Sequence, residues 1–370
     1  MKKKIMHIAQ SAGGVERYIK MFLANTELSN YDNILVCSLD YKKEDYSDFL
    51  FGFEHVDMIR NINVISDFKA IIRIRKLIKK YNPDVIYMHS SKAGALGRLA
   101  NLGINNLSVY NPHGWAFNID AGRLYKKIYA VIEKILSNFC DVIIAISDFE
   151  KESALSNNIC KAEKIKVIYN GIDIDEYNKN NFIITREKLN IPKDAYIIGT
   201  IGRLSKQKAP DTFIESAKRI KEKIPNAYFM LVGDGEDYVE IMKLIDKYNM
   251  KNDILITGWV DNPMEYLQIF DQAMLLSRWE GFGLVLAEYM IAKKPIIATN
   301  VDAIPNIIID GYNGLVVEKD NIDAIVNASI EINNNIKLSE KLVDNGYKLV
   351  NQKFNIKRVV DQFYKEIIGE

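Results

Sequence analysis

Short apolar runs rich in valine and isoleucine alternate with longer amphipathic segments along the whole chain. Runs of this kind without polar alternation are typical of parallel strands buried on both faces, and the segments between them predict helices. The predicted strands lie at residues 4–10, 33–39, 84–90, 107–113, 141–147, 164–170, 196–203, 227–235, 253–260, 272–278, 295–300 and 314–319. Because about twelve strands exceed one comfortable sheet, the pattern favours two doubly wound α/β domains.

The best domain boundary is the segment YNGIDIDEYNKNN, residues 169–181. A strand is predicted to end there, and a polar, asparagine-rich stretch precedes a new helix and strand. We therefore expect one Rossmann-like domain over residues 1–172 and a second over residues 173–351. The last helix, within residues 352–370, is expected to pack back on the first domain.

Composition narrows the class of protein. The chain has 370 residues, of which 48% are hydrophobic and 26% charged, as is typical of a globular protein with more than one core. A net charge of +1 gives no electrostatic reason to expect a nucleic-acid partner. Three cysteines without metal-ligand spacing fit a reducing compartment. Since the N-terminus resembles a strand and not a signal peptide, and no run of about 18 apolar residues exists, we expect a cytoplasmic protein.

Unusual residues follow the predicted strands, and ligands of open α/β sheets bind beyond the carboxyl ends of strands. These residues are Gly13-Gly14, His89 and His113 in the first half, and Gly202-Arg203, Gly233-Asp234-Gly235 and Glu280 to Gly283 in the second. Two such edges facing each other would form one cleft. The sequence therefore predicts an active site between the two domains.

The stretch SRWEGFGLVLAE, residues 277–288, carries the clearest chemistry. Glu280 follows an apolar strand, and a helix is predicted to begin near Gly283 or Leu284. Glycines let a ligand approach the backbone, and the first amides of a helix bind anions. Glu288 lies about one turn deeper, where two neighbouring hydroxyls, such as a ribose diol, would satisfy it. The alternative is a glycine turn beside a solvated glutamate.

Two cations, Arg203 and Lys208, follow another strand in GRLSKQKAP. Near the start of a helix they could hold a diphosphate, with arginine as a planar fork and lysine as a point charge. A solvated surface is the alternative. Gly13 and Gly14 could bring backbone amides to a phosphate, although the chain has neither a GxGxxG nor a GxxxxGK pattern.

Two histidines, His89 and His113, are either catalytic groups or structural hydrogen-bonding groups. The sequence has no HxxxH pattern, and its one DxD, Asp173 to Asp175, lies in the predicted linker. A metal site is therefore not expected.

Two stretches, residues 68–82 and 122–136, are basic and amphipathic. The cations of the first are Lys69, Arg73, Arg75, Lys76, Lys79 and Lys80. Surface helices that touch anionic lipid have this pattern, and a packed helix with a solvated face is the alternative.

Taken together, these motifs resemble the family 4 glycosyltransferases, which are retaining enzymes of the GT-B fold. The resemblance runs in order through AGGVE, HSSKAG, PHG, YNGID, GRLSKQK, GDGE and EGFGLVLAE, the last with the E-x7-E pattern of Glu280 and Glu288. It implies two Rossmann-like, doubly wound parallel-sheet domains facing across a cleft. The first would bind the acceptor and the second the nucleotide sugar. HSSKAGALGRLA and NPHGWAFN are similar to enzymes of capsular and exopolysaccharide biosynthesis.

The resemblance also implies roles for single residues. Arg203 and Lys208 would bind the donor diphosphate, Glu288 the ribose, and Glu280 the hydroxyls of the transferred sugar. His113 would lie beside the reacting sugar, so the expected catalytic residues are Glu280, His113, Arg203 and Lys208. Further donor contacts are expected from Gly13, Gly14, Gly281, Phe282, Gly283 and Leu284, and base contacts near Gly235 and Val260. The acceptor side would include Glu16, His89, Ser90 and Lys92.

The function implied by the resemblance is metal-independent, retaining transfer of a hexosyl or N-acetylhexosaminyl unit from a nucleotide sugar, expected to be a UDP-sugar. The acceptor would be a glycan or an undecaprenyl-diphosphate-linked saccharide, with no cofactor and with possible peripheral contact at the inner face of the membrane. Two alternatives stay open: a UDP-N-acetylglucosamine 2-epimerase of the same fold, and a non-catalytic partner subunit of another glycosyltransferase.

Overall fold

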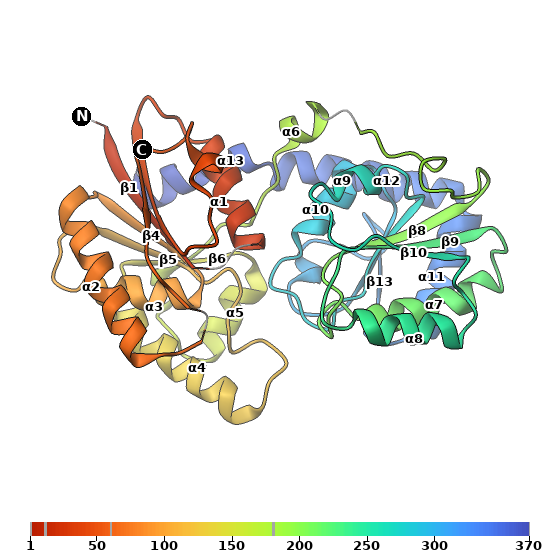
Figure 1. Cartoon of the computed structure of the whole chain (residues 1–370), viewed down its shortest axis with the longest axis horizontal. Coiled ribbons are helices and arrows are strands. Elements are labelled where there is room, and N and C mark those ends of the chain that lie inside the picture. Colours follow the sequence, from red (N-terminus) through yellow and green to blue (C-terminus); the bar gives the residue numbers. More distant parts are fainter. Residues whose placement is uncertain (1, 11–12, 60, 180–181, 370) are drawn as a thin grey trace. The chain divides into compact units, whose positions relative to one another are not determined.

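The computed structural model describes residues 2–10, 13–59, 61–179 and 182–369. Contacts divide the chain into two compact units (Figure 1). Unit 1 contains the chain up to Asp173 and again from Ile356 onward, and unit 2 contains Ile174–Asn355. The last helix of the chain is therefore part of unit 1.

Unit 1 is built on a seven-stranded parallel sheet with the order β3-β2-β1-β4-β5-β6-β7. Its strands are β1 Lys3–Ala9, β2 Tyr31–Cys37, β3 Gly52–His55, β4 Val85–His89, β5 Leu107–Asn111, β6 Val142–Ala145 and β7 Ile165–Val167. The chain moves outward from β1 to β3 and then returns to the other side of β1, at β4. The carboxyl ends of β1 and β4 thus flank the point at which the strand order reverses, where open α/β sheets bind ligands.

Helices cover both faces of this sheet (Figure 1). They are α1 Gly14–Ala24, α2 Val64–Tyr81, α3 Ser91–Ala100, α4 Arg123–Leu136, α5 Asp148–Ser156 and α13 Ile356–Phe363. One apolar core contains residues of α2 and α3, with α4 packed against it, and the opposite core contains residues of α1 and α13. Phe22 of α1 meets Phe363 of α13 edge-on, with ring centroids 5.2 Å apart.

Unit 2 repeats this plan with a six-stranded parallel sheet in the order β10-β9-β8-β11-β12-β13. Its strands are β8 Tyr196–Ile201, β9 Ala227–Val232, β10 Ile254–Ile256, β11 Gln272–Leu275, β12 Ile296–Thr299 and β13 Leu315–Val317. Its helices are α6 Ile174–Lys179, α7 Pro210–Lys221, α8 Tyr238–Lys247, α9 Met264–Leu267, α10 Leu284–Ile291, α11 Ile322–Asn334 and α12 Ile336–Lys353. Here the strand order reverses between β8 and β11.

Each of the predicted strands is present, and the structure adds β3, which the sequence pattern did not reveal. The strand β3 reads GFEH and pairs with β2 at the edge of the sheet. An edge strand buries little apolar surface, so its sequence lacks the valine-rich signature of the central strands. The predicted linker contains the short helix α6, which follows the end of unit 1.

A buried ion pair attaches α4 to the rest of unit 1. Glu133 of α4 accepts hydrogen bonds from Arg98 of α3, at 2.9 Å, and from the hydroxyl of Tyr110, at 2.8 Å. The side chains of Arg98 and Glu133 are 0% and 3% exposed. Since both charges are removed from water, each depends on its partner.

We expect Arg98→Met to lower the free energy of unfolding by about 3 to 5 kcal/mol, because Glu133 would keep a buried charge without its cation. The double variant Arg98→Met/Glu133→Leu should recover at least half of that loss, since it removes both charges. Equilibrium urea unfolding measures both effects. A double variant as unstable as the single one would contradict this account.

Candidate active site

The carboxyl ends of β8 and β11, the central strands of unit 2, carry the most densely connected polar residues of the predicted site. Residues 202–209 follow β8, and residues 276–283 follow β11 and lead into α10. Because the two strands are parallel neighbours, both loops leave the sheet at the same edge.

Glu280 is held in place from three directions. It is 8% exposed. Its carboxylate accepts hydrogen bonds from Lys208 Nζ and from Ser277 Oγ, the latter at 3.1 Å. Its backbone N–H donates to Asp302 Oδ2 at 2.9 Å, which ties the loop to the segment after β12. The predicted cation and the predicted catalytic carboxylate therefore form a partly buried ion pair.

Hydrogen bonds to backbone carbonyls join the two loops around that pair. The N–H of Arg278 donates to the carbonyl of Gln207 at 2.8 Å, and Gln207 Nε2 donates to the carbonyl of Trp279 at 3.0 Å. The guanidinium of Arg278 also bonds to Asp211 and Asp320. The separation of Lys208 and Glu280 is thus fixed by the loops and not only by their own charges.

Arg203 lies at the more open side of the same edge. Its side chain is 64% exposed, and its Nε donates to Glu236 Oε2 at 2.8 Å. Glu236 belongs to the GDGE turn after β9, which packs on the Arg203 loop. A Cβ atom on Gly235 would lie 2.2 Å from the carbonyl oxygen of Leu204, so a glycine is required there for packing. Val260, also predicted near the base, follows β10 and is half-buried.

The helix α10 begins at Leu284, as predicted. Gly283 precedes it with φ of 78°, in the left-handed region that favours glycine. Gly281 and Phe282 complete the turn, and the side chain of Phe282 is buried, so the turn can offer mainly backbone to a ligand. Glu288, one turn into this apolar helix, is 3% exposed.

In unit 1, the turn after β1 leads into α1. Gly13 has φ of 98°, and its N–H donates to Glu16 Oε2 at 3.3 Å. A Cβ atom on Gly14 would meet no atom of the described residues within 4 Å. Packing therefore gives no reason for glycine at position 14, and the space beside the first turn of α1 is open.

His113 and His89 lie together at the ends of β5 and β4. Nε2 of His113 is 3.0 Å from Nδ1 of His89, and the N–H of His113 donates to Asn111 Oδ1 at 2.9 Å. Burial lowers the pKa of His113 to about 3 and that of His89 well below its usual value, so both rings are neutral near pH 7. The side chain of His89 is fully buried, so it has no exposed surface in the structure, and its predicted place on the acceptor side stays a prediction.

Two other residues predicted for the acceptor side differ in their surroundings. Lys92 donates to Asp67 at 2.7 Å and to the carbonyl of Asn61 at 3.0 Å, so its charge is already neutralised near the start of α2. Ser90 has φ of 75° and donates its N–H to the carbonyl of Asn111 at 2.9 Å. The pairing of β4 with β5 places Ser90 near His113. Lys92 instead bonds to Asp67 of α2 and to the segment before that helix.

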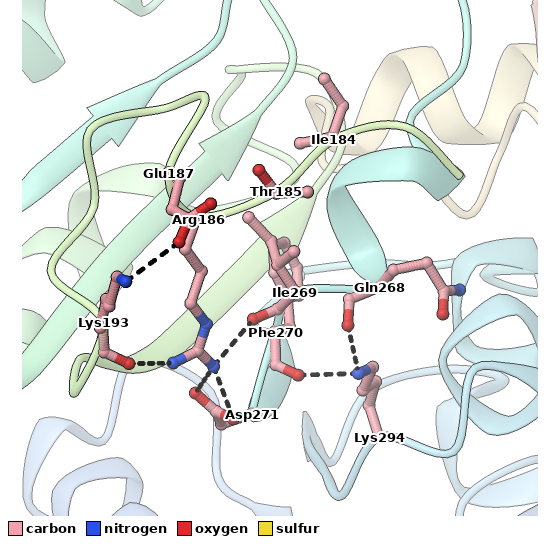
Figure 2. Close-up of a pocket in the computed structure, with 10 residues that line it drawn as sticks. All are labelled: Ile184, Thr185, Arg186, Glu187, Lys193, Gln268, Ile269, Phe270, Asp271 and Lys294. Carbon is pink, nitrogen blue, oxygen red and sulfur yellow. Dashed lines mark hydrogen bonds and ion pairs between the residues drawn. The ribbon is translucent and has the colours of Figure 1, made fainter. Parts of the chain in front are cut away.

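A hollow of about 450 Å³ lies at the other end of the unit 2 strands (Figure 2). Figure 2 shows Arg186 bonded to Asp271, and Lys294 donating to the carbonyls of Gln268 and Phe270. Burial lowers the pKa of Lys294 to about 8. The cations that line this hollow bond to protein atoms. The hollow lies at the amino ends of β8, β11 and β12, so it is separate from the predicted site.

The sequence reasoning missed three residues of these networks. Ser277 and Asp302 hold Glu280, and His7 of β1 contacts His89. Asp302 follows β12 with φ of 45°, and its position after a predicted strand was the available signal. His7 had no signal, since one polar residue in an apolar strand does not indicate its neighbours. Among the described residues, no group of three or more His, Cys, Asp or Glu side chains is arranged to hold a metal ion.

Comparisons with known proteins cover both units of the chain. Residues 181–349 match the family model of the glycosyl transferases group 1, and residues 12–176 match that of glycosyltransferase family 4. The chain is 30% identical to a UDP-Gal:alpha-D-GlcNAc-diphosphoundecaprenol alpha-1,3-galactosyltransferase of Escherichia coli, over 98% of this chain and 95% of that one. It is 25% identical to the capsular polysaccharide biosynthesis glycosyltransferase CapM of Staphylococcus aureus, over 100% and 99%.

A solved structure is similar over the full length. HepE of Anabaena in complex with UDP and glucose superposes with a TM-score of 0.85 at 19% identity, covering 100% of both chains. This similarity concerns the fold alone. It confirms the predicted fold class, GT-B with two Rossmann-like parallel-sheet units.

We expect Gly235→Ala to lower the free energy of unfolding by about 1 to 3 kcal/mol, because the added Cβ would overlap a backbone oxygen. Gly14→Ala is the matched control, and it should change stability by less than about 0.5 kcal/mol because it meets no atom. Urea unfolding of both variants tests the difference. Equal losses would mean that the turns are not packed as described.

Proposed function

Because this chain belongs to the group 1 glycosyltransferases, we propose that it moves a hexosyl or N-acetylhexosaminyl unit from a UDP-sugar to a glycan or lipid-linked saccharide in surface polysaccharide biosynthesis. One observation carries the proposal for unit 2. The Lys208–Glu280 ion pair lies at the strand-order reversal and joins the loop after β8 to the loop that leads into the first turn of α10.

The donor diphosphate would be bound by Arg203, Lys208 and the first amides of α10. A fixed cation about 4 Å from a phosphate oxygen interacts by roughly 4 kcal/mol at an effective dielectric constant near 20. Both cations are paired with carboxylates, Arg203 with Glu236 and Lys208 with Glu280. A diphosphate would displace Glu236 from the exposed Arg203, while Lys208 would bridge the phosphate and Glu280.

The two glutamates would bind opposite ends of the donor. Glu288 is buried one turn into α10, and a buried carboxylate is stabilised by hydroxyl donors such as those of a ribose. Glu280 would accept hydrogen bonds from the transferred sugar while Lys208 and Ser277 hold its orientation. Gly235 and Val260 stay the predicted neighbours of the base, and Gly13 and Gly14 those of the diphosphate.

The names of similar proteins support the choice of donor and acceptor. The relative in Escherichia coli uses UDP-Gal and an undecaprenol-linked acceptor, and the solved HepE structure holds UDP and glucose. We therefore propose a UDP-sugar as the donor and a diphosphate-linked saccharide on undecaprenol as the acceptor.

We propose that transfer proceeds with retention and without a metal ion. As the bond between the anomeric carbon and the UDP oxygen breaks, the sugar gains positive charge and the leaving diphosphate gains negative charge. Arg203 and Lys208 would stabilise the leaving group. The acceptor hydroxyl would attack from the face that UDP leaves and give its proton to the departing phosphate oxygen.

We also propose that unit 1 contacts an anionic membrane surface through α4. Among the described helices, none is long and apolar enough to cross a membrane. Yet Leu124, Ile128, Val131 and Ile135 are 72%, 48%, 55% and 55% exposed. They repeat at helical spacing and share one face of α4. Opposite them is the buried Glu133, so α4 directs one carboxylate inward and leaves an apolar face exposed.

Basic residues lie on the same helix as the exposed apolar face of α4, as binding to anionic lipid would require. The basic residues of α4 are Arg123, Lys126, Lys127 and Lys134. On the same side of the sheet, α2 exposes Ile65, Phe68 and Ile72 among its lysines. An apolar face flanked by cations is the pattern of a helix that lies in the membrane interface. Such contact would bring unit 1 close to a lipid-linked acceptor.

The donor assignment is tested with Glu280→Gln and Glu288→Gln, which keep side-chain size. We expect Glu280→Gln to lower kcat by about tenfold or more with little change in UDP affinity, since its contact is with the sugar. Glu288→Gln should weaken UDP binding by about 1 to 3 kcal/mol, because it loses charge-assisted hydrogen bonds. Turnover assays and calorimetry with UDP measure the two effects.

Ligand-dependent thermal unfolding and analysis of the product separate this function from the two alternatives, the 2-epimerase and the non-catalytic subunit. The wild-type protein should be stabilised against heating by UDP more than by GDP or dTDP, and its product should keep the anomeric configuration of the donor. Epimerised sugar nucleotide in the absence of acceptor would instead indicate the 2-epimerase. No turnover with any donor, despite UDP binding, would indicate the non-catalytic subunit.

Membrane contact is tested by cosedimentation with phosphatidylglycerol vesicles. We expect binding that weakens as salt screens the lysines, and Ile128→Ser/Val131→Ser should lower the partition coefficient by about tenfold or more. Val239→Ser is the matched control, since Val239 is exposed on α8 of unit 2 and should have no effect. Binding that is unchanged by the double variant would exclude α4 as the contact.

A further inference from the structure

Three histidines of unit 1 form one hydrogen-bonded row. His7 lies on β1, His89 ends β4, and His113 follows β5. Nδ1 of His7 is 3.1 Å from Nε2 of His89, and Nδ1 of His89 is 3.0 Å from Nε2 of His113. The strand order β1-β4-β5 places them side by side, although 82 residues separate the first from the second.

The row is enclosed by aromatic rings. Phe22 and Tyr87 have ring centroids 5.7 and 5.6 Å from that of His7, and Tyr18 has its centroid 4.8 Å from that of His113. His7 and His89 are fully buried, and only His113 is partly exposed. Burial lowers the pKa of His7 to about 4, as it lowers those of the other two, so all three rings are neutral near pH 7.

Neutrality links the proton positions of the three rings. A neutral imidazole has one N–H donor and one acceptor nitrogen, and each of the two contacts needs one of each. If His89 carries its proton on Nε2, it donates to His7 Nδ1 and must accept at Nδ1 from His113 Nε2. All three protons then lie on Nε2. In the reverse order all three lie on Nδ1, so the rings must share one tautomer.

We propose that His7 and His89 are positioning residues that fix the ring and the tautomer of His113, so that its Nδ1 is held at one orientation and one hydrogen-bonding role toward the sugar. This rests on the proposed function and on the role that the family resemblance implies for His113, beside the transferred sugar. It goes beyond that function, because it assigns a role to the first strand of the chain. A histidine that bonds through one nitrogen has the role of the other set by that bond.

At the buried end of the row, Asn33 is the polar side chain that acts on His7. Among the described residues, neither Nε2 of His7 nor the side-chain amide of Asn33 has a hydrogen-bond partner within the usual distance, and both residues are fully buried. Asn33 nevertheless lies close enough to His7 to oppose part of the lowering of its pKa. An asparagine can offer either an oxygen or an N–H. Because one orientation of its side chain turns only one of these groups toward His7, that orientation selects one of the two proton orders.

Backbone strain at the exposed end points to a functional constraint. His113 and Ser90 both have positive φ, 53° and 75°, immediately beyond the strands. Such conformations in residues other than glycine cost about 1 to 3 kcal/mol and persist where the surroundings enforce them. Here Asn111 holds both residues. Its side-chain oxygen accepts from the N–H of His113, and its backbone carbonyl accepts from the N–H of Ser90.

Long-range nitrogen–proton correlation NMR of isotope-labelled full-length protein tests the proposal. The chain has four histidines, so single substitutions assign them all. His55 is an internal reference, because its Nε2 lies 2.9 Å from the carbonyl of Tyr41 and must carry the proton. We expect His7, His89 and His113 to be neutral and to share one tautomer near pH 7. Two different tautomers among them, or a protonated ring, would overturn the proposal.

Two substitutions of His7 test its effect on His113. Asn places a hydrogen-bonding atom near the position of Nδ1, whereas Leu cannot bond to His89. We expect His7→Leu to mix the tautomers of His113 and to lower kcat by about tenfold with KM for the donor little changed, the scale of one lost hydrogen bond. His7→Asn should keep the single tautomer and most of kcat. His55→Gln is the control and should leave both unchanged.

The readouts separate this proposal from the proposed function. A tautomer that the three histidines share in the wild type, and that is lost in His7→Leu, supports the positioning role of His7 even if the donor proves not to be a UDP-sugar. Equal loss of kcat in His7→Leu and His7→Asn, with the tautomer of His113 unchanged in both, would assign His7 a packing role only. That result would overturn the positioning role of His7 and leave the proposed function standing.

Discussion

Parallel pairing within each sheet is the constraint on which both sets of candidate residues depend. Because neighbouring strands run in the same direction, their carboxyl ends lie at one edge, and every loop that leaves that edge can share contacts with the next. In unit 2 this brings Lys208 to Glu280 and Glu280 to Asp302. In unit 1 it aligns His89 with His113. The hollow at the opposite edge of unit 2 has charged residues too, but they bond to protein atoms there.

Buried polar groups give these sites their geometry. Glu280 is held by Lys208 and Ser277, Glu133 by Arg98, and the histidine row by its own ring nitrogens. A buried charge or imidazole without its partner would be costly, so each network can adopt few arrangements. The same rule explains the orientation of α4. Its inward face is fixed by a charge, which leaves an apolar face in contact with solvent in the isolated chain.

Local patterns predicted much of the fold and part of the site. The valine-rich runs identified the buried strands, and the glycines before an apolar segment predicted a helix start near Gly283 or Leu284, where α10 begins. They did not identify β3, whose edge position buries little surface, or the pairing of Lys92 with Asp67. The glycine at position 235 was expected near a ligand, and the structure adds a packing reason, because a Cβ atom there would lie 2.2 Å from the carbonyl oxygen of Leu204. Sequence could not distinguish these reasons for a glycine, because both require a small residue.

The sequence by itself determined where strands end and which chemical groups follow them, since hydrophobic periodicity and turn residues act over a few positions. Only the tertiary structure decided which of those groups meet. Lys208 and Glu280 are 72 residues apart, and His7 and His89 are 82 apart. Their contacts follow from a strand order that departs from chain order, and that order is set by packing of whole helices and sheets. No short pattern encodes it.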